Sequence, residues 1–141
     1  MKSVVATLDD LPEIVELEAC FPTKERWSET SWAQELRGSR RTTLVARDVR
    51  LLGVITFQDM GEAADLNRIV VRPDARRQGV ADALMQAGLG AVDKRCLLEV
   101  RDDNLPAVEL YRKHGFSMIH RRNDYYGAGA DALVMERNCK P

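Results

Sequence analysis

The spacing of apolar residues along the chain predicts four helices. In segments 9–20, 28–37, 80–92 and 104–114, apolar positions recur every three or four residues, which is the period of an amphipathic helix. Ser28 and Asn104 suit N-caps, because their side-chain oxygens can accept a hydrogen bond from a free amide of the first turn. Gly38 and Gly115 suit the C-terminal ends of two of these helices, where glycine commonly ends a helix.

Seven short segments rich in β-branched and other apolar residues predict strands. They are Ser3–Ala6, Thr42–Ala46, Leu51–Phe57, Ala64–Val71, Cys96–Arg101, Phe116–Arg121 and Ala132–Arg137. Segments 42–46 and 51–57 are separated by a tight polar turn, which predicts a hairpin, and segment 64–71 extends it to a meander. Segment 96–101 is strongly apolar, which predicts a strand covered on both faces of its sheet.

The order of these elements predicts a single α/β (α+β) domain spanning residues 1–141. Consecutive strands pair antiparallel, whereas strand–helix–strand units cross over to parallel neighbours. We therefore expect a mixed, mostly antiparallel central sheet of about seven strands, with helices on both faces.

Composition and charge exclude several classes of protein. A chain of 141 residues with 45% hydrophobic and 30% charged residues is typical of a globular domain, and a formal net charge of -1 disfavours nucleic-acid binding. No run approaches the roughly 20 apolar residues that a membrane span needs, and the first residues do not resemble a secretory signal. We therefore expect a cytoplasmic protein with no nucleic-acid or membrane partner. The 3 cysteines and 2 histidines form no cluster, which predicts reduced thiols and no metal.

The segment from Leu66 to Gly79 is the most informative part of the chain. A strand ends at Val71, a loop with Arg76 and Arg77 follows, and a helix begins at Gly79. The first turn of a helix has free N–H groups and a partial positive charge, which together bind phosphate oxygens. On its own, this pattern favours an ordinary helix start that carries two solvated arginines over a phosphate-binding site.

The run I-V-V-R-P-D-A-R-R-Q-G-V-A-D-A-L-M resembles the acetyl-CoA-binding segment of the GNAT family, the GCN5-related N-acetyltransferases. This resemblance implies a GNAT fold and acetyl-CoA as cosubstrate. It implies that the strand pairs with the pantetheine arm, that the Val71 N–H is a candidate oxyanion donor, and that the helix start holds the pyrophosphate. The residues that it assigns to the cofactor are Ile69, Val70 and Val71 along the arm, and Arg76, Arg77, Gln78, Gly79, Val80, Ala81 and Asp82 around the phosphates.

The run L-E-V-R-D-D-N-L-P-A-V-E-L-Y-R-K-H-G-F resembles the next block of the family, and specifically its RimI-like branch, which acetylates the N-terminal alanine of a small-subunit ribosomal protein. The resemblance implies Glu99 as general base, Tyr111 as general acid and Asn104 as a further contact to the pantetheine arm. Without it, Glu99 could equally form an ion pair with Arg101 or Arg68, and Tyr111 could be a half-buried packing residue.

The predicted acceptor groove comes from two further matches to this branch, F-P…W-S-E and R-R-N-D-Y-Y. They implicate Phe21, Trp27, Glu29, Tyr125 and Tyr126, although tryptophans are more often core residues. The branch usually has F-P-W-S and R-R-N-Y-Y without a break, and a longer spacer before L-E-V-R; the first two departures leave the peptide preference open.

The predicted activity is therefore acetylation of a protein N-terminus, with a ribosomal protein as partner and a monomer or weak homodimer as the working form. A lysine side chain or a small amine is the alternative acceptor. A non-enzymatic acyl-CoA-binding module and a small nucleic-acid-binding domain are the competing classes.

Overall fold

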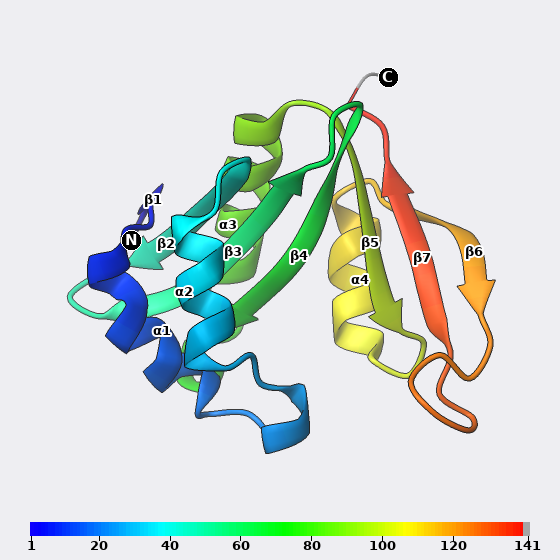
Figure 1. The fold of residues 1–141 in the computed structure, drawn as a ribbon, viewed down its shortest axis with the longest axis horizontal. Coiled ribbons are helices and arrows are strands. Elements are labelled where there is room, and N and C mark those ends of the chain that lie inside the picture. The colour runs from blue at the N-terminus through cyan, green and yellow to red at the C-terminus, as the bar shows by residue number, and fades with distance from the viewer. Residues whose placement is uncertain (140–141) are drawn as a thin grey trace.

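The structure, a computed structural model that describes residues 1–139, forms one mixed sheet in the order β1-β2-β3-β4-β5-β7-β6 (Figure 1). The strands are β1 Lys2–Val5, β2 Arg41–Arg47, β3 Leu51–Asp59, β4 Ala63–Val71, β5 Arg95–Arg101, β6 Ser117–Arg122 and β7 Ala132–Arg137. All neighbouring strands pair antiparallel except β4 and β5. The predicted fold class is confirmed.

Two of the helices begin directly after their predicted N-caps. The helices are α1 Leu11–Glu18, α2 Glu29–Arg37, α3 Val80–Val92 and α4 Leu105–Lys113. Ser28 accepts a hydrogen bond from the Ser31 amide, and Asn104 accepts one from the Ala107 amide, as expected for N-caps. A short 3-10 turn capped by Thr7 precedes α1, so α1 itself begins two residues later than predicted.

Two helical layers cover the sheet. Helices α1 and α2 lie over β2, β3 and β4 on the face turned toward the viewer in Figure 1, and α3 and α4 lie on the other face. The α1–α2 side buries Ile14, Trp32 and Val70 in one cluster, whereas the α3–α4 side buries a larger cluster that includes Phe57 and Leu84. Burial of these side chains supplies most of the driving force for folding.

The sheet opens between β4 and β5. These two strands pair only at Ala63–Arg95, Ala64–Cys96 and Asp65–Leu97, and no further ladder pairs join them toward their C-terminal ends. Figure 1 shows β4 and β5 diverging below this point. The second half of β4 therefore has a strand neighbour on one side only, which is β3.

Two expectations about the second half of the sheet are wrong. β7 inserts between β5 and β6, so the β5–α4–β6 unit does not end beside β5. β5 is covered on one face only: Leu98 and Val100 are buried, whereas Glu99 and Arg101 are exposed. The reason is that α1 and α2 lie over β2–β4, which leaves the outer face of β5, β7 and β6 without a covering helix.

Candidate active site

The open edge of β4 presents backbone groups to the gap. The Arg72 amide donates to the Leu52 carbonyl at 2.8 Å, so Arg72 and Val70 occupy the hydrogen-bonded positions of the β3–β4 ladder. In an antiparallel pair the residues between such positions point their N–H and C=O groups away from the partner strand. Ile69 and Val71 therefore direct their backbone groups toward the gap between β4 and β5, where an extended ligand could pair with them.

The loop before α3 turns at two residues with left-handed backbone conformations. Arg77 and Gly79 both have positive φ, 65° and 80° respectively, and Gly79 is the N-cap of α3, so the chain turns into the helix at this point. A Cβ placed on Gly79 would meet no atom within 4 Å, so space lies open beside the helix start. Val80 is buried in the core and fixes the first turn, and Ala81 follows with a small side chain.

The other side chains predicted to surround the phosphates lie in different places. The Arg76 guanidinium stacks 5.6 Å from the Phe21 ring, and the Gln78 amide reaches the Asp74 carbonyl at 3.5 Å. Asp82 is engaged with α4: its carboxylate pairs with Lys113 at 2.9 Å and with His114 at 2.8 Å. These two partners lower the pKa of the Asp82 carboxyl and tie α3 to α4.

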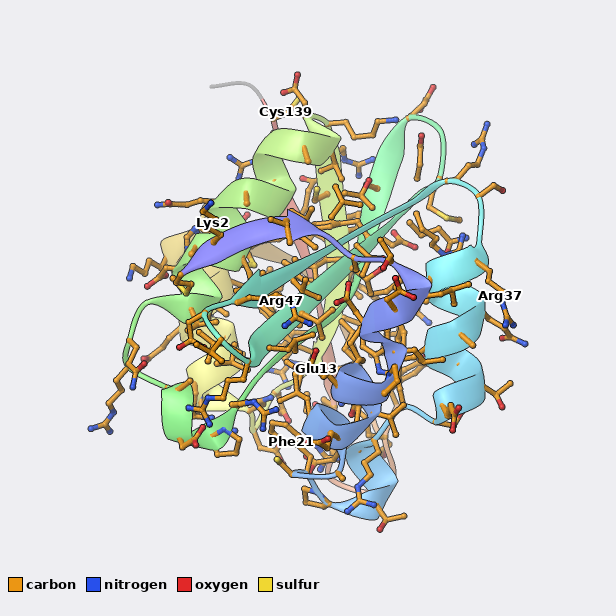
Figure 2. The ribbon with its side chains drawn as sticks, turned by 90° about the vertical axis from the view of Figure 1, so that its left-hand side faces the viewer. Lys2, Glu13, Phe21, Arg37, Arg47 and Cys139 are labelled. Atoms are coloured by element: carbon orange, nitrogen blue, oxygen red, sulfur yellow. The ribbon has the colours of Figure 1, made fainter. Side chains whose placement is uncertain are left out.

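A cavity of about 220 Å³ lies along the open edge of β4. Its lining residues come from the α1–α2 loop, β4, the loop before α3 and the N-cap of α4; they are Phe21, Glu25, Arg68, Ile69, Val70, Val71, Arg76 and Asn104. Figure 2 shows Phe21 at the end of the molecule opposite Cys139. The structure thus brings the predicted arm-binding residues, Asn104 and Phe21 together in one place.

Tyr111 lies on the buried side of α4, with its ring edge-to-face against Phe116 at 5.9 Å between centroids. Burial raises the pKa of the Tyr111 phenol to about 12, opposed by the positive charge of Arg68. Within residues 1–139 no buried side-chain oxygen or nitrogen lacks a hydrogen-bond partner, and none of the hydrogen bonds there involves the Tyr111 hydroxyl. That hydroxyl therefore reaches accessible space, and it keeps its proton at neutral pH.

Glu99 lies on the uncovered face of β5, with its side chain 35% exposed. Its carboxylate forms an ion pair with Arg122 of β6 at 3.2 Å, reaching diagonally across β7. Neither of the two partners considered from the sequence is used: Arg101 pairs with Asp103, and Arg68 pairs with Glu18. The register of β5, β7 and β6 decides this pairing. The spacing of residues along the chain does not reveal that register.

The loop between β6 and β7 folds its tyrosines back onto this face. The Arg122 guanidinium lies 5.2 Å from the Tyr125 ring, and the Arg101 guanidinium lies 5.5 Å from the Tyr126 ring. Burial and the nearby negative charge of Glu99 raise the pKa of the Tyr126 phenol. Tyr125, Tyr126 and Glu99 are therefore gathered in one cluster with Arg101 and Arg122.

The remaining two predicted groove residues lie in and beside the α1–α2 loop. Trp27 packs against Trp32 at 4.8 Å between ring centroids, with the Arg68 guanidinium 5.8 Å from its ring. It is partly buried at the edge of the α1–α2 core. Glu29 is the exposed first residue of α2 and is not among the residues that line the cavity.

Two buried carboxylates were missed by the sequence analysis. Glu18 and Glu35 are only 2% and 6% exposed, and both face β4 from the helices above it. Glu18 accepts from Arg68 at 2.6 and 2.8 Å, and Glu35 accepts from Asn67 at 3.1 Å. Acidic residues in an amphipathic helix are usually solvated, so the chain carries no local signal that these two are buried.

Residues 1–139 contain no group of three or more potential metal-ligating side chains. Cys96 is fully buried in the core, and burial raises the pKa of its thiol to about 11, so the thiol stays protonated at neutral pH. Over the same residues, no helix has the length and apolar character required to cross a bilayer.

The sheet opens between β4 and β5 on the side where β4 leads into α3, and the free amides at the start of a helix can bind an anionic ligand. Residues 8–116 match the acetyltransferase (GNAT) family, and the chain belongs to this family. GNAT enzymes use acetyl-CoA as the acetyl donor. The residues of this chain fit that molecule, because unpaired strand amides suit the pantetheine arm and the space beside Gly79 suits the pyrophosphate.

Several known proteins are similar over nearly the whole chain. A putative [ribosomal protein bS18]-alanine N-acetyltransferase of Bacillus subtilis (strain 168) is 29% identical over 135 residues, which are 91% of this chain and 89% of that protein. The [ribosomal protein bS18]-alanine N-acetyltransferase of Escherichia coli (strain K12) is 29% identical over 136 residues, 87% of this chain and 91% of that protein.

Solved structures agree on the fold. The crystal structure of the ribosomal-protein-S18-alanine N-acetyltransferase from Escherichia coli superimposes with a TM-score of 0.87 at 26% identity, covering 99% of this chain and 94% of that one. An aminoglycoside 6'-N-acetyltransferase complexed with coenzyme A gives the same TM-score of 0.87 at 15% identity, covering 100% of this chain and 98% of that one. The second likeness concerns the fold alone.

Proposed function

We propose that this protein transfers the acetyl group of acetyl-CoA to the N-terminal amine of a protein, and that its acceptor is the N-terminal alanine of the ribosomal protein bS18. The observation that carries the proposal is the open edge of β4, where the amides of Ile69 and Val71 face the gap between β4 and β5. Similarity over most of the chain to two bS18-alanine N-acetyltransferases supports the choice of acceptor.

Glu99 is proposed as the general base. An α-amino group with a pKa near 7.7–8.0 is roughly 10% neutral at pH 7, whereas a lysine with a pKa near 10.4 is only about 0.04% neutral. A partly exposed carboxylate is sufficient to accept the proton of an α-ammonium, directly or through one water. Arg122 holds the Glu99 carboxylate at 3.2 Å on the uncovered face of β5.

Tyr111 is proposed as the general acid. The nitrogen of the amine attacks the thioester carbon, the C–S bond breaks, and the departing sulfur needs a proton. The phenol of Tyr111 holds its proton at neutral pH because burial raises its pKa to about 12. Its hydroxyl reaches accessible space from α4, the helix that Asn104 starts beside the cavity.

The backbone supplies the remaining stabilisation. The N–H of Val71, which points into the gap, is the proposed donor to the carbonyl oxygen as negative charge builds on it. The first turn of α3 with Gly79, aided by Arg76 and Arg77, is the proposed pyrophosphate site. Acetyl-CoA supplies the activated acetyl thioester, and these groups hold and orient it.

The proposed acceptor site is the mouth formed by the α1–α2 loop and the β6–β7 loop. Phe21 and Trp27 belong to the first loop, and Tyr125 and Tyr126 belong to the second. Figure 1 shows both loops at the same end of the molecule, the end toward which β4 and β5 diverge. Such a mouth admits a chain end, and we expect the enzyme to meet its acceptor in the cytoplasm.

The test is a competition between amine classes with acetyl-CoA and purified protein. We expect fast acetylation of a peptide with the N-terminal sequence of bS18. We expect at least a tenfold lower kcat/KM for a lysine peptide with a blocked N-terminus, and for a polyamine. Turnover of the lysine peptide or the polyamine without turnover of the alanine peptide would refute the proposed acceptor, though not the family.

A further inference from the structure

The second half of β4 carries a β-bulge at Asn67. Thr56 pairs with Arg68 and Phe57 pairs with Leu66, so Asn67 is an extra residue with no partner on β3. Before the bulge, Leu66 faces the α3–α4 cluster; after it, Ile69 and Val71 pack on that same cluster. The bulge therefore reverses the alternation of β4 and brings Arg68 and Val70 to the α1–α2 face.

This reversal decides which amides reach the gap. In a strand, a shift of one residue turns every side chain and every N–H group to the opposite side. Ile69 and Val71 present their amides to the gap only because the extra residue is placed at Asn67. If the bulge lay at another position in β4, different amides would face the pantetheine arm of acetyl-CoA.

Two carboxylates hold the bulge from above. Glu18 of α1 binds the Arg68 guanidinium through both oxygens, at 2.6 and 2.8 Å. Glu35 of α2 accepts from the Asn67 amide at 3.1 Å and from the Thr56 hydroxyl, opposite the bulge on β3, at 2.7 Å. Because a bulge places neighbouring residues on one face, each of the two adjacent side chains has its own anchor on a different helix.

Both anchors are built into the core. The Glu18 carboxylate also accepts from the Trp32 indole at 2.9 Å, and Glu35 also accepts from Arg41 at 3.1 Å. A buried carboxylate with this many donors is rigid, because any displacement leaves an unpaired charge in the core. The Arg68 guanidinium further donates to the Glu25 carbonyl at 2.9 Å, which fixes the α1–α2 loop relative to β4.

We propose that Glu18–Arg68 and Glu35–Asn67 form a clamp that fixes the bulge of β4, and that these four residues are positioning residues for acetyl transfer. The clamp acts through the backbone, because it holds the amides of Ile69 and Val71 where they can pair with the pantetheine arm. This inference rests on the proposed function for its activity readout, but it makes a separate prediction about binding.

The first test is binding. We compare coenzyme A with 3′-phospho-ADP, which carries the nucleotide end of coenzyme A without the arm. In Asn67→Ala and in the conservative Arg68→Lys, affinity for 3′-phospho-ADP should stay within about threefold of the parent, because α3 holds that end. The ratio of the affinity for coenzyme A to the affinity for 3′-phospho-ADP measures the contribution of the pantetheine arm, and this ratio should fall at least fivefold. If the affinities for coenzyme A and 3′-phospho-ADP fell together, or if neither fell, the proposed clamp would be wrong.

The second test is turnover of whichever amine the parent enzyme acetylates. Misplacing a reactive group by about 1 Å can cost 100-fold, so we expect kcat to fall 10- to 100-fold in Asn67→Ala. Asn67→Gln, which keeps an amide donor for Glu35, should recover part of that loss. The control is Glu136→Gln, which removes an ion pair with Arg95 away from the bulge and should leave kcat within twofold. A folded Asn67→Ala enzyme with the parent's kcat would refute the inference.

The two proposals fail in distinguishable ways. If the parent acetylates no alanine-starting peptide, the proposed acceptor is wrong, and the comparison of coenzyme A with 3′-phospho-ADP still tests the clamp. If the parent is active and clamp variants bind and turn over normally, the clamp is wrong and the proposed function stands.

Discussion

Replacement of Gly79 by valine tests the position of the cofactor most directly. Gly79 has a φ of 80°, a left-handed conformation that costs a residue with a Cβ about 1–2 kcal/mol. A Cβ there meets no protein atom within 4 Å, so no steric clash adds to this cost. For a domain of this size we expect the melting temperature of Gly79→Val to fall by about 5 °C in the absence of ligand.

The effect on ligand binding should be larger than the effect on stability. Coenzyme A at 100 times its dissociation constant stabilises the parent by about 2.7 kcal/mol, which corresponds to a rise in melting temperature of roughly 10 °C. In Gly79→Val the branched side chain occupies the space beside the first amides of α3, where we place the pyrophosphate. We therefore expect no measurable rise, as checked by thermal unfolding with and without coenzyme A.

Gly129 provides a matched control. It has a φ of 78°, a Cβ on it would also meet nothing within 4 Å, and it lies in the β6–β7 loop away from α3. Gly129→Val should lose a similar amount of stability and keep the full rise with coenzyme A. An equal rise in the two variants would mean that the cofactor binds elsewhere, and would refute the reasoning about the α3 N-terminus.

Three further predictions concern titratable groups. Tyr111→Phe should lower kcat at least tenfold while coenzyme A affinity and melting temperature change little, since the hydroxyl has no partner within residues 1–139; unchanged turnover would remove Tyr111 as the acid. Glu99→Gln should lower kcat near pH 7 at least tenfold with little change in coenzyme A affinity; a small loss would mean that water accepts the proton. Burial raises the pKa of the Cys96 thiol from 9.0 to about 11. The contribution of the buried, protonated thiol to the free energy of unfolding is therefore fully present below pH 9 and is lost as the pH rises toward 11. Urea unfolding at pH 8 and pH 10.5 should show this loss in the parent and less of it in Cys96→Ala.

The ends of the helices are the parts that the sequence predicts best. Ser28 and Asn104 cap α2 and α4 through bonds that span three residues, and Gly38 and Gly115 lie at the C-terminal ends of the same two helices. Such features depend on neighbours in the chain, so residue type and spacing are sufficient to predict them.

Apart from the start of α1, the errors involve contacts between distant segments. The apolar run of β5 predicts burial on both faces, but whether a helix covers a face depends on where α1 and α2 lie. The partner of Glu99 is Arg122, 23 residues further along, and the pair forms only because β7 inserts between β5 and β6. No local pattern contains this information.

The sequence alone therefore determined the helices and strands and the family resemblance. Both depend on periodicity, caps and glycines, which act over a few positions of the chain. The tertiary structure decided which carboxylates are buried, where β4 leaves β5, and which amides face the gap. These properties depend on strand register and on the packing of α1 and α2 against β4. They arise only when segments far apart in the chain are brought together and their polar groups must all find partners.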